Sequence, residues 1–244
     1  MDDEHQHGHG CDDGGDVSEW KKVAEMRAVV EAQDPSAKDE DDDFVLRRFL
    51  RARDHNIVKA SAMLLQYLSW KRSAKPNGSI SDDEVRGEIA KGRIRLEGFD
   101  RLGRPMGYLY SARHFPARHD FEDYKRYCAY VLDKICSSLP AGQEKFAAVV
   151  DLRGWGYSNL DIRGYLAGLN ILQNYYPERL GRVFVIHVPY IFMAAWRIVY
   201  PFIDERTRSK IVFVADKDLD ATLHDAIDDS QLLDDYGGKL KPQV

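Results

Sequence analysis

Cysteine is scarce in this sequence, which has three in 244 residues, at positions 11, 128 and 136. An odd and sparse set of this kind builds no disulfide framework and is typical of a reducing compartment. The N-terminus also lacks the apolar run of a secretory signal peptide. We therefore expect a cytosolic protein.

A surplus of basic residues is also missing. The net charge is −5, and residues 1–16 hold six acids but no Lys or Arg, so the rest of the chain carries a net charge of +1. Such a nearly neutral body does not favour nucleic-acid binding. We expect residues 1–16 to form a disordered tail. Its histidines at positions 5, 7 and 9 and Cys11 lack the supporting groups that fix metal ligands, so we predict no metal site.

Complete catalytic motifs are lacking as well. The segment GWGYSN follows the apolar run AAVVDL and has two glycines of a dinucleotide-binding turn, but Asn159 occupies the third position. Ser158 lacks the second glycine of a nucleophile elbow. Cys128 and Cys136 have no arginine-containing loop after them, and the histidines are scattered. We predict a protein that is not an enzyme and needs no cofactor, with a nucleotide-dependent α/β enzyme as the alternative.

Hydrophobic periodicity divides the remaining chain into two regions. Residues 17–78 show helical periodicity, beginning with a helix over 17–32, whereas residues 79–241 alternate strand-like runs with amphipathic helical segments. The runs KFAAVVDL and RVFVIHV each contain a continuous apolar stretch, FAAVV and VFVI, as in strands buried on both faces. We therefore predict an α/β fold, in which a helical N-terminal region (17–78) precedes a domain with a mostly parallel sheet (79–241).

One long apolar stretch runs from Val183 to Ile203, close to the ~20 residues that a membrane-spanning helix needs. Arg197, Pro189 and Pro201 argue against such a helix. A strand that ends near Pro189, followed by a helix, fits the pattern better. That helix is apolar around its circumference and needs apolar surroundings. It either lies in the protein core or has the core on one side and a lipid or bilayer on the other.

Several segments together resemble the CRAL-TRIO family of lipid-binding and lipid-transfer proteins. They are LRRFLRAR, VVDLRG, NYYPERLGRVFVIHVP, PFIDERTRSKIVFV and the closing YGG, in this order over most of the chain. The resemblance implies a deep apolar lipid pocket on the sheet and a mobile helical gate over 189–210. We assign the gate and pocket to the following residues: Tyr190, Phe192, Met193, Trp196, Ile198, Val199 and Phe202.

The resemblance also implies a lipid head-group site. In members that bind phosphatidylinositol, positions matching Glu178, Thr207 and Lys210 hold the inositol phosphate, and we add Asp204 and Arg53 as neighbours. Lysine supplies charge to a phosphate, the threonine hydroxyl donates or accepts, and the carboxylate accepts from sugar hydroxyls. The alternative for Glu178 is a surface ion pair with a nearby arginine.

Some positions depart from the family pattern. An aromatic residue is common where this chain has Gly107, and a serine where it has Gly156; both bear mainly on phosphatidylcholine. We therefore leave choline-lipid binding open.

The function that follows is intracellular lipid binding and transfer, with phosphatidylinositol as the expected ligand. Its partners would be that phospholipid, a possible second lipid and, transiently, a membrane surface; we expect a monomer. Two alternatives share the fold: a binder of a tocopherol-like or retinoid-like molecule, and an adaptor that binds only proteins.

Overall fold

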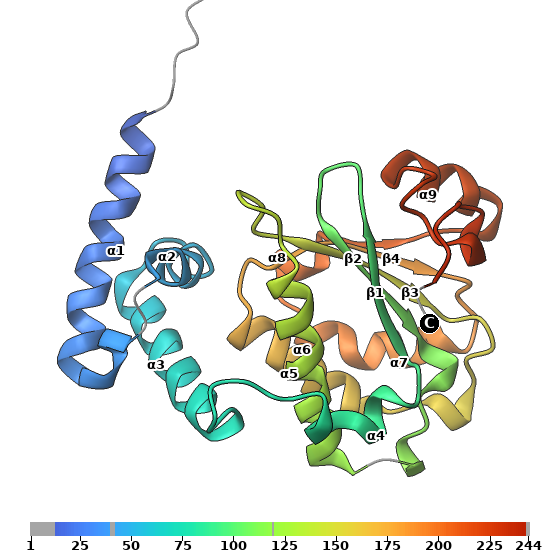
Figure 1. Cartoon of the computed structure of the whole chain (residues 1–244), viewed down its shortest axis with the longest axis horizontal. Helices are drawn as coiled ribbons and strands as arrows, with labels where there is room; N and C mark the ends of the chain where they lie inside the picture. Colours follow the sequence, from blue (N-terminus) through green and yellow to red (C-terminus); the bar gives the residue numbers. More distant parts are fainter. Residues whose placement is uncertain (1–12, 40–41, 119, 243–244) are drawn as a thin grey trace, which may run out of the picture. The chain divides into compact units, whose positions relative to one another are not determined.

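The computed structural model describes residues 13–39, 42–118 and 120–242, without the side chains of 13–16 and 39 (Figure 1). The chain divides into two compact units, Met1–Trp70 and Lys71–Val244. This division falls inside helix α3 (Ile57–Ala74), before the domain boundary proposed at residue 78. Residues 1–12 of the expected tail, with its histidines and Cys11, lie outside the described residues. Helix α1 (Asp13–Gln33) begins at Asp13, four residues before the predicted start at residue 17.

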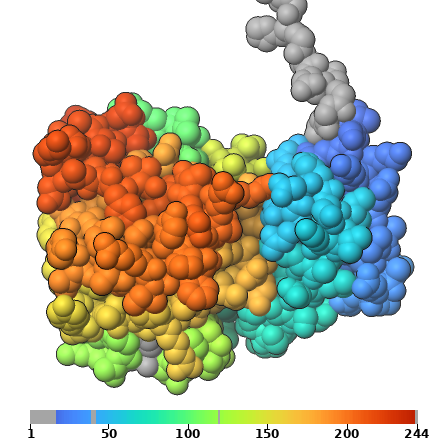
Figure 2. Space-filling model, turned by 180° about the vertical axis from the view of Figure 1, so that it is seen from behind, coloured from blue at the N-terminus to red at the C-terminus, as the bar shows by residue number. Residues whose placement is uncertain are grey.

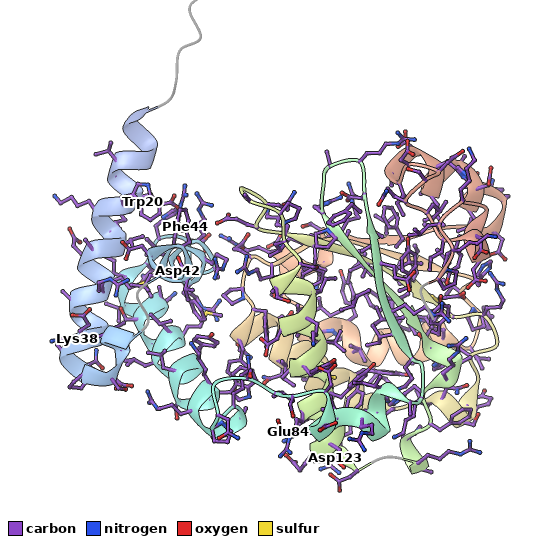
Figure 3. The ribbon with its side chains drawn as sticks, viewed as in Figure 1. Trp20, Lys38, Asp42, Phe44, Glu84 and Asp123 are labelled. Carbon is purple, nitrogen blue, oxygen red and sulfur yellow. The ribbon has the colours of Figure 1, made fainter. Side chains whose placement is uncertain are left out.

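The first unit is helical, as predicted. It consists of α1 (Asp13–Gln33), η1 (Pro35–Asp39), α2 (Asp43–Arg51) and most of α3 (Ile57–Ala74). Asp42 starts α2 by accepting a hydrogen bond from the Phe44 backbone N–H at 2.8 Å, as N-cap aspartates do. Trp20 of α1 and Phe44 of α2 lie next to each other, edge to face, with ring centroids 5.4 Å apart (Figure 3).

The second unit is built on a five-stranded sheet with strand order β1-β2-β3-β4-β5. Strands β1 and β2 are antiparallel, and every later pair is parallel. The predicted, mostly parallel sheet is therefore confirmed. The strands are β1 (Ile94–Phe99), β2 (Pro105–Tyr110), β3 (Phe146–Asp151), β4 (Leu180–Ile186) and β5 (Ile211–Phe213). The helical elements are η2 (Asp83–Val85), α4 (Arg86–Ile89), η3 (Ser111–Arg113), η4 (Pro116–Arg118), α5 (Phe121–Ser137), η5 (Tyr157–Asn159), α6 (Ile162–Tyr175), α7 (Phe192–Val199), η6 (Tyr200–Phe202), α8 (Glu205–Arg208), η7 (Asp216–Asp218), α9 (Leu219–Ala226) and η8 (Asp234–Tyr236).

Both faces of the sheet are covered, because successive side chains of a strand point to opposite faces. Phe184 and Ile186 pack in one cluster with Leu223 of α9 and with the C-terminal Leu232 and Leu233. Val183 and Val185, which point to the opposite face of β4, belong to a second cluster, which includes residues of α7. The members of this second cluster include Leu152, Trp155, Val183, Val185, Phe192, Ala195 and Ile211.

A buried hydrogen bond ties the C-terminal segment to the sheet. The Tyr236 hydroxyl donates to Asp151 Oδ2 at 3.0 Å, while Asp151 Oδ1 accepts from the Arg153 backbone N–H at 2.8 Å. Burial and the nearby Asp151 carboxylate raise the pKa of Tyr236 above its ordinary value, so the phenol stays a donor.

We expect Tyr236→Phe to lower the free energy of unfolding by about 1–3 kcal/mol, because it leaves a buried carboxylate oxygen without its donor. Urea denaturation of lipid-free protein measures this change. Tyr157→Phe, at a tyrosine that is 78% exposed, is the matched control and should stay within about 0.5 kcal/mol of the wild type. Equal stability of both variants would show that the Tyr236 bond contributes nothing.

Candidate functional site

Two of the predicted head-group residues lie at one end of the sheet. Glu178 precedes β4 and Lys210 precedes β5, and these strands are parallel neighbours. Their amino ends therefore lie side by side. The Val183 backbone N–H donates to the Lys210 carbonyl at 2.8 Å, which fixes the start of β5 against β4.

Asp204 and Thr207 form the N-terminal cap of α8. Asp204 Oδ1 accepts from the Thr207 backbone N–H at 2.7 Å, and Asp204 Oδ2 accepts from the Thr207 hydroxyl at 2.9 Å. Thr207 is buried. Since its proton is donated to Asp204, the Thr207 oxygen can still accept a hydrogen bond. The cap thus holds both residues in a fixed geometry.

Glu178 is paired with an arginine that the sequence analysis did not name. Arg206 Nη1 donates to Glu178 Oε1 at 3.1 Å, and the Glu178 side chain is 17% exposed. The alternative interpretation of Glu178, an ion pair with a nearby arginine, therefore describes the structure. A carboxylate accepts several hydrogen bonds, so this pair leaves Glu178 able to accept from a ligand.

Lys210 is a half-buried cation in this group. Burial lowers the pKa of Lys210, and the Glu178 charge opposes that shift in part. Within the described part of the chain, no carboxylate lies within 4.0 Å of its Nζ. A partly desolvated ammonium of this kind gains from an anionic ligand, because attraction is stronger away from bulk water.

Gln173 of α6 holds the turn that carries Asp204, and sequence reasoning missed it. Its Oε1 accepts from the Asp204 backbone N–H at 2.8 Å, and its Nε2 donates to the Phe202 carbonyl at 3.2 Å. The sequence gives no signal for this contact, because the partners belong to elements far apart along the chain. Arg206 could have been noticed as one of the basic residues in ERTRSK.

Arg53, the remaining predicted head-group residue, belongs to the first unit. Its Nη1 donates to the Ala52 carbonyl at 2.9 Å. Its role in the head-group site stays a prediction.

The predicted gate is a chain of short helices and not one long helix. α7 covers Phe192–Val199, η6 continues through Pro201, and α8 follows after Asp204. Pro201 has no backbone N–H, so the α-helical hydrogen-bond pattern stops there. The orange surface in Figure 2 belongs to this part of the sequence.

One side of the gate packs on the sheet. Ala195 and Val199 are buried, and Phe192 lies edge to face on Trp155 with centroids 5.3 Å apart. Trp196 makes the same kind of contact with Phe213 of β5, at 5.0 Å. Trp196 and Met193 are partly buried.

The other side of the gate is exposed. Tyr190 is 93% exposed and Phe202 60%, and Ile198 is also exposed. Simple burial in the core, one of the two sequence interpretations, is therefore wrong for these residues. These three residues belong to one segment of the chain, and apolar side chains that form one exposed patch mark interaction surfaces.

The residues considered for catalysis have structural roles. Asn159 donates to the carbonyls of Ala112 and His114 at 3.0 and 2.9 Å and accepts from the Gly156 N–H at 2.8 Å, so its amide closes the GWGYSN loop. Burial raises the pKa of the Cys128 thiol to about 11, which disfavours the nucleophilic thiolate.

Among residues 13–39, 42–118 and 120–242, no helix combines the length and apolar character needed to cross a bilayer. The same residues contain no group of three or more His, Cys, Asp or Glu side chains arranged to hold a metal ion.

A family model described as the CRAL/TRIO domain matches residues 90–238, and the chain belongs to this family of lipid-binding and lipid-transfer proteins. The chain is 31% identical over 194 residues to the CRAL-TRIO domain-containing protein C23B6.04c of Schizosaccharomyces pombe, covering 79% of this chain and 18% of that protein. It is 27% identical over 205 residues to the phosphatidylinositol transfer protein PDR17 of Saccharomyces cerevisiae, covering 79% of this chain and 56% of that protein. The chain thus spans less than two thirds of both relatives.

The crystal structure of Sfh5 resembles this structure with a TM-score of 0.70 at 17% sequence identity. The match covers 91% of this chain and 88% of that one. The resemblance confirms the predicted fold, with N-terminal helices and a mostly parallel sheet flanked by helices.

Proposed function

We propose that this protein binds phosphatidylinositol and transfers it between membranes in the cytosol without chemical conversion. The observation that carries the proposal is the group of polar residues at the amino ends of β4 and β5, which we call the head-group cluster: Glu178, Asp204, Arg206, Thr207 and Lys210. There a half-buried Lys210 lies near the Glu178–Arg206 pair and the Asp204–Thr207 cap. An ammonium and a guanidinium suit the phosphate of such a head group, and carboxylates can accept hydrogen bonds from the hydroxyl groups of its sugar-like ring. One relative, PDR17 of Saccharomyces cerevisiae, is itself named a phosphatidylinositol transfer protein.

The gate supports the transfer step. Each buried methylene of a lipid favours an apolar environment by ~0.8 kcal/mol, so two chains of roughly 16 carbons need about 25 kcal/mol of matched environment. A closed gate would shelter the chains in an apolar pocket. Its exposed Tyr190, Ile198 and Phe202 would contact a membrane surface when lipid is exchanged. We propose this contact as transient and the protein as a monomer.

Native mass spectrometry of the full chain after incubation with mixed-phospholipid vesicles tests the proposal. We expect bound phosphatidylinositol in the wild type and its loss in Glu178→Ala/Lys210→Ala. Glu205→Ala/Lys217→Ala removes the same charges from two exposed positions and should keep the lipid.

Two other outcomes would revise the proposal. Phosphatidylinositol that persists in Glu178→Ala/Lys210→Ala would place the head group elsewhere. A wild type that takes up a tocopherol-like or retinoid-like molecule and no phosphatidylinositol would reject the proposed ligand, and uptake of no lipid would favour the adaptor.

A further inference from the structure

A second charged site lies at another edge of the sheet. Strands β1 and β2 are antiparallel, so the start of β1 and the end of β2 meet, and the Tyr110 backbone N–H donates to the Arg93 carbonyl at 2.8 Å. The residues before β1 and after β2 surround a pocket of about 350 Å³. The lining residues are Lys91, Arg93, Ala112, Arg113, Phe115 and Arg118.

This pocket is separate from the head-group cluster. β2, β3, β4 and β5 are parallel, and the pocket lies where β2 ends, whereas Glu178 and Lys210 precede β4 and β5. The two sites therefore occupy opposite ends of the sheet. The volume of the pocket at the end of β2 is within the range of small-molecule sites.

Positive charge dominates the pocket. Of the six lining residues that the structure describes, four are cations, and the Glu88 carboxylate pairs with two of them, Lys91 and Arg93. For Arg113 and Arg118, no carboxylate lies within 4.0 Å in the described part of the chain. The group therefore carries a surplus of positive charge, which attracts anions.

Arg113 and Arg118 are held in place by uncharged contacts. Arg113 Nη1 donates to the Gly92 carbonyl at 2.7 Å, and its guanidinium lies 4.5 Å from the Tyr110 ring centroid. The Arg118 guanidinium lies 4.6 Å from the Phe115 ring centroid. Lys91 Nζ donates to the Arg118 carbonyl at 3.1 Å. These contacts orient Arg113 and Arg118 and leave most of their N–H donors for a ligand, whereas Lys91 already uses two of its three donors, on Glu88 and on the Arg118 carbonyl.

Arg93, another lining residue, is buried. Its Nη1 lies 2.8 Å from His114 Nδ1, and His114 Nε2 lies 2.8 Å from Asp161 Oδ2. An arginine always donates, so His114 Nδ1 accepts, and the His114 proton lies on Nε2, facing Asp161. The histidine is then neutral and adds no charge of its own to the pocket. Arg93 Nε is buried and has no hydrogen-bond partner among the described residues.

We propose that this pocket binds a phosphomonoester. A terminal phosphate presents three oxygens and nearly two negative charges, and guanidinium groups bind it with paired hydrogen bonds. Three arginines and a lysine around a small pocket fit such a group better than a carboxylate, which has two oxygens and one charge. Ala112 and Phe115 provide an apolar wall for the carbon skeleton that carries the phosphate.

The phosphomonoester can belong to a free metabolite or to a lipid head group, and two probes distinguish these sources. The first is glycerol 3-phosphate, measured by isothermal titration calorimetry. The second is phosphatidic acid in phosphatidylcholine vesicles, measured by co-sedimentation. Phosphatidylglycerol vesicles are the control for charge alone, since their phosphate is a diester. All measurements use the full chain with Glu178→Ala/Lys210→Ala, so that the head-group cluster does not contribute.

We expect binding of at least one of the two phosphomonoester probes and at least about tenfold weaker binding in Arg113→Ala/Arg118→Ala, because two charged donors are lost. Both arginines are exposed, so this variant should fold. Arg86→Ala removes a charge from α4, next to the pocket but outside its lining, and should bind like its parent. Binding of neither probe, equal loss in Arg86→Ala, or equal binding to phosphatidylglycerol vesicles would each overturn the proposal.

Discussion

Lys210→Met should lower phosphatidylinositol transfer roughly 10- to 100-fold, the effect of losing a charge-assisted hydrogen bond to a phosphate. The same substitution should raise the free energy of unfolding of the lipid-free protein by about 1 kcal/mol. The two effects have opposite signs because the ammonium is half buried without a close carboxylate. Its charge is unfavourable in the empty protein and favourable once an anion binds.

The stability difference should also depend on pH. Burial lowers the pKa of Lys210 below its ordinary 10.5 in the folded protein. Between the lowered pKa and 10.5 the unfolded chain binds more protons, so wild-type stability rises with pH in that window. The advantage of Lys210→Met is therefore complete below the folded-state pKa and should shrink as the solution becomes alkaline.

Thermal unfolding of lipid-free protein and vesicle-to-vesicle transfer of labelled phosphatidylinositol measure both effects. Lys217→Met, at an exposed lysine of η7, is the control and should change neither quantity. A Lys210→Met protein that is less stable and still transfers lipid would make Lys210 a structural residue and remove it from the head-group site.

Gly238→Ala should destabilise the protein by about 3 kcal/mol or more. A Cβ at this position would lie 1.9 Å from the Leu232 carbonyl oxygen and 2.4 Å from its carbon. Backbone atoms cannot rotate away as a flexible side chain does. The Gly238 N–H also donates to the Leu233 carbonyl at 3.1 Å, inside the loop that places Leu232, Leu233 and Tyr236 on the sheet. A methyl group at Gly238 must therefore displace this loop, which packs on one face of the sheet.

Gly87→Ala is the matched control for this effect. An added Cβ at Gly87 meets no atom within 4 Å, and the residue lies in α4, where alanine is favoured over glycine. We expect it to be neutral or stabilising by up to about 1 kcal/mol. Thermal denaturation compares the two variants. Similar midpoints for Gly238→Ala and the wild type would show that the C-terminal loop rearranges freely.

The order and type of the main elements could be predicted from the sequence, because they depend on local patterns. The apolar runs around Val149 and Val185 became the central parallel strands β3 and β4, and the segments between them became helices. Proline at position 201 also indicated a break in the gate. The strand KFAAVVDL, for example, is apolar at successive positions because both faces of its sheet are covered.

The sites depended on tertiary structure. Glu178 and Thr207 could be named from the sequence only through a family resemblance, and nothing in it pairs Glu178 with Arg206 or Gln173 with Asp204. The basic pocket likewise joins Lys91 to Arg118 across the β1–β2 pair. Periodicity constrains neighbours within a few residues, so the sequence by itself determined the elements and their apolar faces. Contacts between distant residues depend on strand register and on the paths of loops, and these are fixed only when the whole chain packs.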